Sequence, residues 1–597
     1  MEDIEGVLGE NREGNGKETA YQHHEQASLN RQTLEASMEH TAVPASAERL
    51  SWMTVTAIFF LGLSLVAPIS LVVGLTSAIL TQIALDLNDL DSIPWLVGSY
   101  GISSSVAYGI AGNLSDVFGR RYTMILGNLM LLVGSIVGGV AQNMGTLIAA
   151  MAIGGFASGL IFVAYAGISE LVPKKYRGVG LGWAEFAMIL PWGALSVFLA
   201  NKINSSATWR WIFYISIIYC VLCSVGLAIF YFPPSRPQED YEKSRLDEFL
   251  SIDFVGVALY TAGLTTFLVG LTWADTSGHP WNSASVIAPI VAGIVAVGVA
   301  FAYDFTVAKQ PFFPPSLFAQ WRQFTVLLVV IFVTGMCYFA LTTQLPQVAL
   351  YVYRNNPTDI GITCIPGGLG QLFFGAIAPL LIHRLKHVKL QLIAILTLQA
   401  AAVGLLSVTV PHHRAGFMVL QFFAQGCFPW IVVTTYLTAS LHAPQKQIGL
   451  AIGLVGTFRS AGGSFGNAIF STILRSVVDD KLVPEISAAA LAAGVPSSEL
   501  EALIPATFQA GYGTPDTFAA IPAATLQVQR AVMEAFSGAY GYAYKRVFWG
   551  LMAFNILAIG VACLIRDPSH LLTNQTSVYM EKQALGRGRT EKPTDEV

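Results

Sequence analysis

Two charged side chains lie inside long apolar stretches of this sequence. Glu185 follows GVGLGWA, and Arg459 precedes SAGGSFG. A charge at the centre of a membrane costs roughly 2.5–3.5 kcal/mol or more, so each position needs a reason. Desolvation penalises the charged form of a carboxyl group, which makes Glu185 a candidate for binding a proton and releasing it when water enters. The alternative is a structural Glu185 near a helix end, paired with a Lys or Arg of the adjacent loop.

Arg459 has three candidate roles: it could bind an anionic group, balance a carboxylate, or belong to a gate at the inner membrane face. Because it lies only about three turns into its apolar stretch, we favour gating or coupling over direct contact with a substrate. Gly462 and Gly466 follow it at a spacing that lets two membrane helices pack closely.

Membrane helices are the elements that must position these charges. Of 597 residues, 54% are hydrophobic and only 12% are charged, and the mean hydropathy is +0.57. A soluble domain usually carries about 25% charged residues. The apolar stretches are continuous, whereas strands of a membrane barrel alternate apolar and polar residues. The sequence therefore predicts an all-α polytopic membrane protein, and its net charge of −4 favours no nucleic-acid partner.

A spanning helix needs roughly 20 mainly apolar residues. Fourteen stretches qualify, near residues 54–80, 94–112, 122–141, 146–168, 179–200, 211–232, 253–273, 285–305, 324–346, 360–382, 390–410, 415–440, 449–474 and 546–566. With a cytoplasmic N-terminus, the short inner loops hold 14 Lys and Arg residues and the short outer loops hold 4. This bias predicts that both termini are cytoplasmic.

Three polar segments flank or interrupt the spans. Residues 1–50 and 567–597 are predicted to be disordered cytoplasmic tails. Residues 475–545 are rich in Ala and Pro and would form a long outer loop, containing either a short interfacial helix or a plain connector.

Motifs for enzymatic chemistry are lacking. The sequence has no H-E-x-x-H, no P-loop and no G-x-S-x-G in a strand–turn–helix setting, and its six cysteines indicate no disulfide framework. We therefore expect a membrane transporter rather than an enzyme, with no catalytic residues, no metal site, no cofactor and no ATP-driven step.

A charged motif separates the second and third predicted spans. It runs from Gly112 to Arg121 and reads GNLSDVFGRR. Gly112 allows two helices to approach closely, and Asp116 lies at the inner face near the expected start of the thirteenth span, whose positive N-terminal dipole would attract a carboxylate. Arg120 and Arg121 can pair with carboxylates or lipid phosphate. A plain basic loop would need neither Asp116 nor the glycines Gly112 and Gly119.

This motif resembles the G-x-L-[SA]-D-x-x-G-R-R signature of the major facilitator superfamily, in the loop where that family keeps it. Trp209–Phe213 (WRWIF) and Glu170–Pro173 (ELVP) are similar to segments of its fourteen-span drug:proton antiporters. The whole chain looks most like the fungal trichothecene efflux pumps. The resemblance implies that the gating signature comprises Gly112, Asp116, Gly119, Arg120 and Arg121.

The resemblance also implies the major facilitator fold, in which two six-helix halves flank two linker helices. The halves would cover residues 51–235 and 322–566, and the linker helices would lie within 250–306. We expect a monomer in the lipid bilayer. Antiporters of this superfamily usually carry a Gly-Pro-rich signature in span five. Of this Gly-Pro-rich signature, the present sequence retains Pro191 and Gly193, which predict a bend in the helix.

Aromatic and amide side chains in the predicted spans are candidates for a cavity wall, because aromatics supply contact area and amides orient a ligand. The set suits an uncharged, partly oxygenated organic molecule. Its members are Trp183, Trp192, Gln344, Gln371, Gln425 and Tyr436.

We therefore expect a secondary active transporter that exports a small organic molecule, such as a fungal toxin, secondary metabolite or drug, by proton antiport. The expected location is the plasma membrane, or alternatively a vacuolar or vesicle membrane. The first span carries no acidic residue, so Glu185 or another group must couple protons, or coupling is absent. Two alternatives remain: a siderophore–iron uptake transporter of the same fold, and a transporter-like receptor that does not transport.

Overall fold

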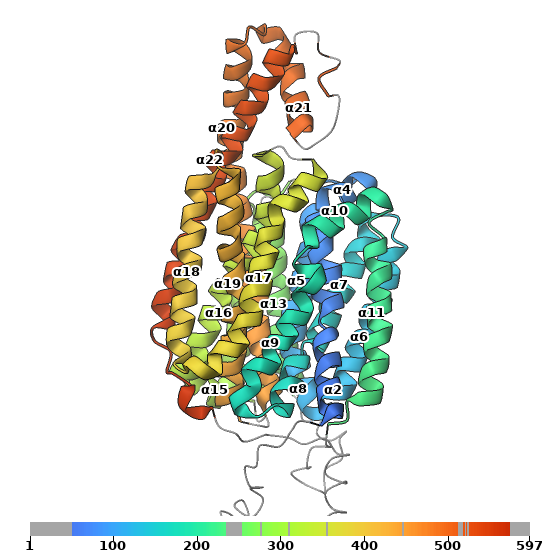
Figure 1. Ribbon diagram of the computed structural model, residues 1–597, viewed down its shortest axis with the longest axis vertical. Coiled ribbons are helices and arrows are strands. Elements are labelled where there is room, and N and C mark those ends of the chain that lie inside the picture. The colour runs from blue at the N-terminus through green and yellow to red at the C-terminus, as the bar shows by residue number, and fades with distance from the viewer. Residues whose placement is uncertain are drawn as a thin grey trace, which may run out of the picture. The chain divides into compact units, whose positions relative to one another are not determined.

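The computed structural model describes residues 51–233, 253–274, 278–308, 311–353, 356–444, 447–511, 517–519, 521 and 524–572. Every regular element in these residues is a helix (Figure 1). The tail predicted at residues 1–50 and most of the tail predicted at 567–597 lie outside the described residues.

The helices follow the order of the predicted spans. The first part of the chain forms α2 (Trp52–Leu63), α3 (Thr76–Ala78), α4 (Leu80–Asp86), α5 (Ile93–Phe118), α6 (Arg120–Gly139), α7 (Met144–Ile161), α8 (Ala164–Leu171), α9 (Arg177–Met188), α10 (Ser196–Ser206) and α11 (Trp211–Phe230). Next come α13 (Phe254–Trp273) and α14 (Ala284–Thr306). The last part forms α15 (Pro315–Ala319), α16 (Val326–Tyr351), α17 (Pro357–Leu385), α18 (Val388–Thr409), α19 (Arg414–His442), α20 (Ile448–Ala492), α21 (Leu500–Gly511) and α22 (Leu526–Ala562).

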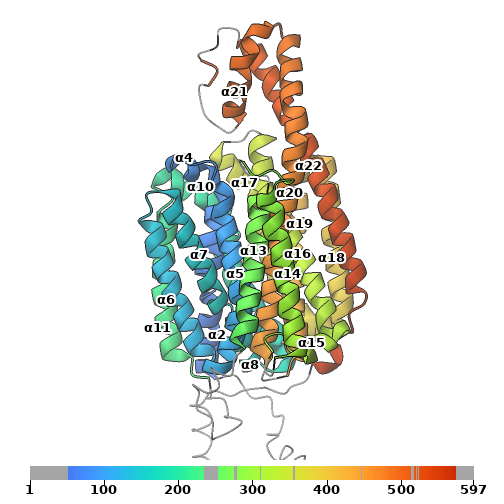
Figure 2. The same cartoon turned by 180° about the vertical axis from the view of Figure 1, so that it is seen from behind.

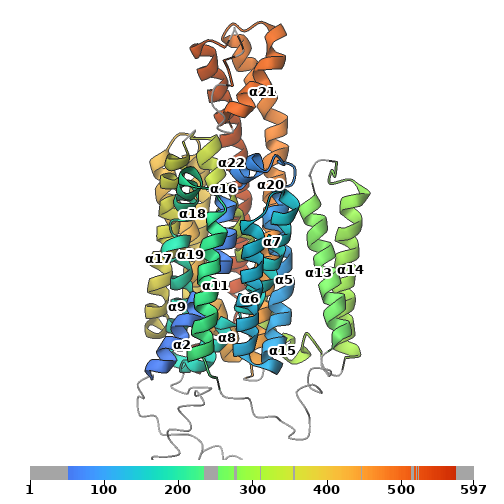
Figure 3. The same ribbon diagram turned by 90° about the vertical axis from the view of Figure 1, so that its right-hand side faces the viewer.

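Two groups of helices stand side by side. The blue and teal helices α2 to α11 form one group in Figure 1, and the yellow to red helices α16 to α22 form the other. The pair α13 and α14 stands beside α5 and α20 (Figures 2 and 3). Tyr260 of α13 fixes this pair, because its hydroxyl lies 3.1 Å from the Ser105 carbonyl oxygen of α5 and 3.3 Å from Thr457 Oγ1 of α20.

Within the described residues, twelve helical segments are long and apolar enough to cross a membrane. They overlap twelve of the fourteen predicted spans. The other two spans coincide with α5 and α20, which are rich in Ser and Gly and carry Asp116 and Arg459. The all-helical membrane architecture is confirmed, whereas the count of fourteen spans stays a prediction.

The segment predicted at 475–545 as a long outer loop, with either a short interfacial helix or a plain connector, is mostly helical in the described residues, and its position outside the membrane stays a prediction. Helix α20 continues to Ala492, and α22 begins at Leu526. The Ala-rich sequence favours a helix, and Val478, Leu482 and Ile486 recur every four residues on one face. These side chains are buried in one apolar cluster with residues of α22. We call this extension, formed by α20, α21 and α22 beyond the bundle, the hairpin (Figure 1).

Helices α5 and α20 cross at a separation that only glycine permits. A Cβ added at Gly112 would lie 2.6 Å from the carbonyl oxygen of Gly449, and one at Gly453 would lie 2.5 Å from that of Tyr108. Close backbone approach of this kind is how small residues strengthen helix packing in membranes. The crossing joins the first group of helices to the second.

We expect Gly453→Val to destabilise the protein, because the new side chain would meet the Tyr108 backbone and overpacking typically costs about 1–3 kcal/mol. Gly560→Val on α22 is the matched control, since nothing lies within 4 Å of a Cβ added there. Thermal unfolding of the purified protein in detergent should give a lower midpoint for Gly453→Val than for Gly560→Val. Equal midpoints would contradict the close crossing.

Candidate functional site

The signature segment joins α5 to α6 at one end of the bundle, which we call the signature end. Gly119 has a φ of +91°, a conformation that favours glycine, and α6 begins directly after it. Asp116 lies in the last turn of α5. Its Oδ2 accepts a hydrogen bond of 3.0 Å from the backbone N–H of Leu450, in the first turn of α20. The carboxylate thus occupies a helix N-terminus, where backbone N–H groups lack partners within the helix.

Arg120 holds the Asp116 carboxylate from its other side. Its Nη1 lies 2.5 Å from Asp116 Oδ1, and its Nη2 lies 2.7 Å from Glu170 Oε1 at the end of α8. Arg120 is 2% exposed, so a buried guanidinium is neutralised by two carboxylates. A buried charge deprived of such partners is strongly destabilising. The network brings Glu170 of the ELVP segment into the same site.

Arg121 makes a different contact from the one considered from sequence. Its Nη2 donates to the carbonyl oxygen of Ala228 at 2.6 Å, in the last turn of α11, and its guanidinium lies 3.9 Å from the ring centre of Phe232. A cation at a helix C-terminus interacts favourably with the helix dipole. Among the described residues, the partners of Arg121 are therefore a backbone carbonyl group and an aromatic ring.

A second contact joins the two groups of helices at the signature end. Arg177, the first residue of α9, donates from Nη1 to the carbonyl oxygen of Ser440 at 2.8 Å, near the C-terminal end of α19. Its side chain is buried. Sequence reasoning missed this contact, because a basic residue at the start of a span also fits the positive-inside bias.

Two adjoining cavities lie between the groups of helices. The smaller has a volume of about 150 Å³ and the larger about 610 Å³, and both are lined by Phe339, Arg459 and Asn467. The larger follows α5 and α20 from Arg459 to Val483 and Phe508 of the hairpin. The space between the helix groups therefore extends from the middle of the bundle to the end opposite the signature end.

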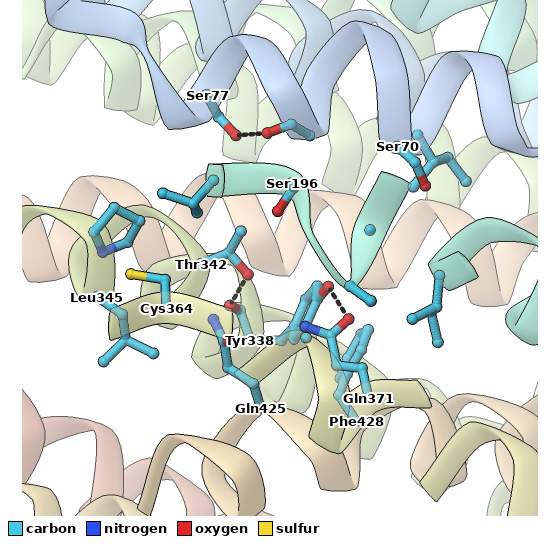
Figure 4. A pocket seen from close by; sticks show the side chains of 18 of the residues that line it. Ser70, Ser77, Ser196, Tyr338, Thr342, Leu345, Cys364, Gln371, Gln425 and Phe428 are labelled. Carbon is cyan, nitrogen blue, oxygen red and sulfur yellow. Dashed lines mark hydrogen bonds between the residues drawn. The ribbon is translucent and has the colours of Figure 1, made fainter. Parts of the chain in front are cut away.

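Aromatic and amide groups meet on one wall of the smaller cavity (Figure 4). The Tyr338 hydroxyl donates to Gln371 Oε1 at 3.1 Å, and the Tyr338 ring stacks on Phe428 with centroids 3.7 Å apart. Gln425 lies beside them in Figure 4. Such a wall offers an organic ligand both ring contacts and hydrogen bonds.

Glu185 lines the smaller cavity and is 4% exposed. The Tyr165 hydroxyl of α8 donates a hydrogen bond to Glu185 Oε1. The Tyr165 ring stacks on Phe162 with centroids 4.5 Å apart. The sequence alternative of a Glu185 paired with a loop cation is not the arrangement seen, because its partner is a buried tyrosine.

Arg459 lines both cavities and is 6% exposed. Its guanidinium carbon lies 4.6 Å from the centre of the Phe162 ring. Nine residues of α20 separate it from the Leu450 contact, a rise of roughly 13 Å. The structure thus places Arg459 in the cavity, close to Glu185 and away from the signature segment.

The predicted cavity residues divide into two sets. Gln371 and Gln425 line the smaller cavity. Four others line neither cavity and pack elsewhere: Trp183 stacks on Phe59 of α2, Trp192 donates to Tyr219 of α11 at 3.0 Å, Gln344 donates to Ser471 of α20 at 3.4 Å, and Tyr436 stacks on Tyr165. A role of these four residues in a cavity wall stays a prediction, because residue type and span alone do not tell which face of a helix points inward.

The bend expected at Pro191 and Gly193 has a structural counterpart. Helix α9 ends at Met188, the turn Ile189–Gly193 follows, and α10 begins at Ser196. Leu190 has non-helical angles of φ −100° and ψ 128°. This turn places Ile189 and Gly193 in the wall of the smaller cavity.

Sequence reasoning also missed several small polar residues of the larger cavity. Ser104 of α5 and Ser460 of α20 line it and lie 2.9 Å apart through their hydroxyl oxygens. Asn467 accepts from Thr343 at 3.2 Å. The low hydropathy of α5 and α20 was the available signal, because helices that border a polar cavity need fewer apolar residues than helices that face lipid.

Comparison with known proteins agrees with these observations. Residues 29–592 match the family described as fungal trichothecene efflux pump (TRI12). Trichothecene efflux pump TRI12 of Fusarium sporotrichioides is 27% identical over 504 residues, which cover 83% of each chain. The MFS-type transporter prx5 of Penicillium rubens is 26% identical over 85% of this chain and 90% of its own.

A solved structure supports the fold alone. The human organic anion transporter MFSD10 (TETRAN) superposes with a TM-score of 0.50 and 14% sequence identity, over 83% of this chain and 99% of its own. The family match covers all of the described residues, including the signature segment and both cavities. The chain belongs to the fungal trichothecene efflux pump family of the major facilitator superfamily.

Proposed function

We propose that this chain exports a small organic molecule by alternating access and that proton antiport drives the export. The observation that carries the proposal is the difference between the two ends of the bundle. The Asp116–Leu450 and Arg177–Ser440 contacts close the signature end, while the larger cavity extends to the hairpin. Membership of an efflux family favours export over siderophore–iron uptake.

The orientation follows from charge. The excess of Lys and Arg on the signature side supports placing that end and both termini in the cytoplasm. The conformation described here then faces outward. We place the protein in the plasma membrane as a monomer, since export there removes the cargo from the cell.

Asp116 acts as the inner latch in this proposal. A carboxylate at a helix N-terminus contributes typically 0.3–1 kcal/mol, and about 2 kcal/mol where it is partly buried. Its partner belongs to the other helix group, so the contact is lost when the inner end opens. An interaction of this size shifts the ratio of two conformations by roughly tenfold and still permits the cycle.

Glu185 carries the coupled proton in this proposal. It lies at the smaller cavity, which adjoins the larger one, so a proton can reach it from outside while the signature end is closed. Opening of the inner end would let water reach Glu185 from the cytoplasm and allow the proton to leave. The hydrogen bond from Tyr165 connects this event to Phe162, which contacts Arg459.

A drug-sensitive yeast strain that expresses the chain tests export directly. We expect improved growth on at least one fungal toxin from a panel that includes a trichothecene, together with lower toxin retention. A protonophore should abolish both effects, because the proton gradient drives the transport. Growth improved only on siderophore-bound iron, with no change in toxin retention, would contradict the proposed direction.

The substitution Glu185→Gln removes the proton-binding group and keeps the shape of the side chain. We expect it to abolish pH-driven accumulation of cargo in inverted vesicles and to leave exchange of labelled for unlabelled cargo intact, because exchange needs no net proton movement. Glu534→Gln, at an exposed position of the hairpin, is the matched control and should behave as wild type. Undiminished pH-driven accumulation by Glu185→Gln would remove Glu185 from the coupling mechanism.

A further inference from the structure

Arg459 is a buried cation whose guanidinium has no hydrogen bond and no carboxylate within ion-pair distance among the described residues. Its one described contact is the face of the Phe162 ring, 4.6 Å from the guanidinium carbon. A ring face attracts a cation and accepts none of its N–H groups in ordinary hydrogen bonds. A buried arginine that lacks such partners is costly and therefore calls for an explanation.

Arg459 lies at the junction of the two cavities, which explains why it is buried without a hydrogen-bond partner. It is one of the residues common to both cavities, and so it stands where they meet. Ser460, Ser464 and Asn467 follow it along the same cavity wall on α20. A guanidinium with free N–H donors, facing a cavity of about 610 Å³ and flanked by small polar groups, is suited to hold an oxyanion.

The charges around the cavities fit the same conclusion. Among the described residues, Glu185 is the carboxylate that interacts electrostatically with Arg459, and its other such neighbours are phenols, including those of Tyr108, Tyr165 and Tyr436. In the larger cavity the remaining charged side chains are Arg475 and Asp479, which offset each other. The charged side chains that line the larger cavity therefore carry one net positive charge, that of Arg459.

We propose that Arg459 is the anion subsite of the transport cavity and that the cargo is an amphipathic organic acid whose carboxylate binds there. The proposal rests on the proposed export function and names its substrate class. The aromatic wall of Phe339, Tyr338 and Phe428 then accommodates the apolar body of the ligand. This cargo differs from the uncharged molecule expected from sequence, which was inferred from aromatic and amide residues while Arg459 was assigned to gating or coupling.

Binding of two matched fluorescent probes to the purified protein in detergent tests the subsite. Dansylglycine and dansylglycinamide share one aromatic body and differ in the carboxylate. We expect wild-type protein to bind dansylglycine roughly tenfold to a hundredfold more tightly than the amide, the range of a charge-assisted hydrogen bond. Arg459→Gln should remove this preference and leave the affinity for the amide unchanged. Arg459→Lys should retain part of it.

Arg546→Gln is the matched control, because Arg546 is an exposed arginine of α22 that lines neither cavity, and its removal should leave the preference intact. The comparison in wild-type protein needs no variant. Equal affinities, or no binding of either probe, would overturn the subsite even if Arg459→Gln failed to fold. A preference that persists in Arg459→Gln would also overturn it.

The export function and the anion subsite can be refuted independently of each other. Toxin export by a protein with equal affinity for both probes would keep the export function and refute the anion subsite. A carboxylate preference that depends on Arg459, in a protein that moves no cargo in yeast, would keep the subsite and refute export.

Discussion

The arrangement of this protein depends on one contact between a carboxylate and a helix N-terminus. Asp116, in the last turn of α5, accepts from the backbone N–H of Leu450 in the first turn of α20, and so joins two helices that are more than three hundred residues apart in sequence. The glycines at 112, 449 and 453 make the approach close enough. Arg120 and Glu170 fix the direction of the carboxylate. In the proposed cycle this contact closes one end of the bundle, and the larger cavity extends to the opposite end.

A second constraint is the cost of charge in the membrane interior. Glu185 and Arg459 avoid lipid by lining the cavities, and an aromatic pair connects them. Tyr165 binds Glu185 through its hydroxyl, and Phe162 presents its ring face to Arg459. The two charges are therefore held near each other without a direct ion pair among the described residues. In a direct ion pair, each charge would already be neutralised by the other. Without such a pair, Glu185 can bind a proton and Arg459 can bind an anionic ligand.

Features that repeat along the chain could be predicted from sequence. Continuous apolar stretches identified the helices, and the signature segment identified the contact of Asp116 with the thirteenth predicted span. Properties that depend on rotation about a helix axis could not be predicted, because the face that points inward is set by neighbours distant in sequence. Gln371 and Gln425 point into the cavity, whereas Trp183 and Trp192 pack against α2 and α11. The hairpin was missed because its alanines and scattered charges resemble a loop in composition, although their spacing is helical.

We propose that Asp116 holds the signature end closed, and the separation of the two helix groups at that end reports this directly. Spin labels at Tyr122→Cys and Leu385→Cys, two exposed positions at that end in different helix groups, would report the separation after replacement of the exposed Cys563. We expect one narrow distance distribution when Asp116 is present. In Asp116→Asn, a second and longer distance should appear, because a neutral amide binds the α20 N-terminus less strongly than a carboxylate does. Identical distributions in the two proteins would contradict the claim.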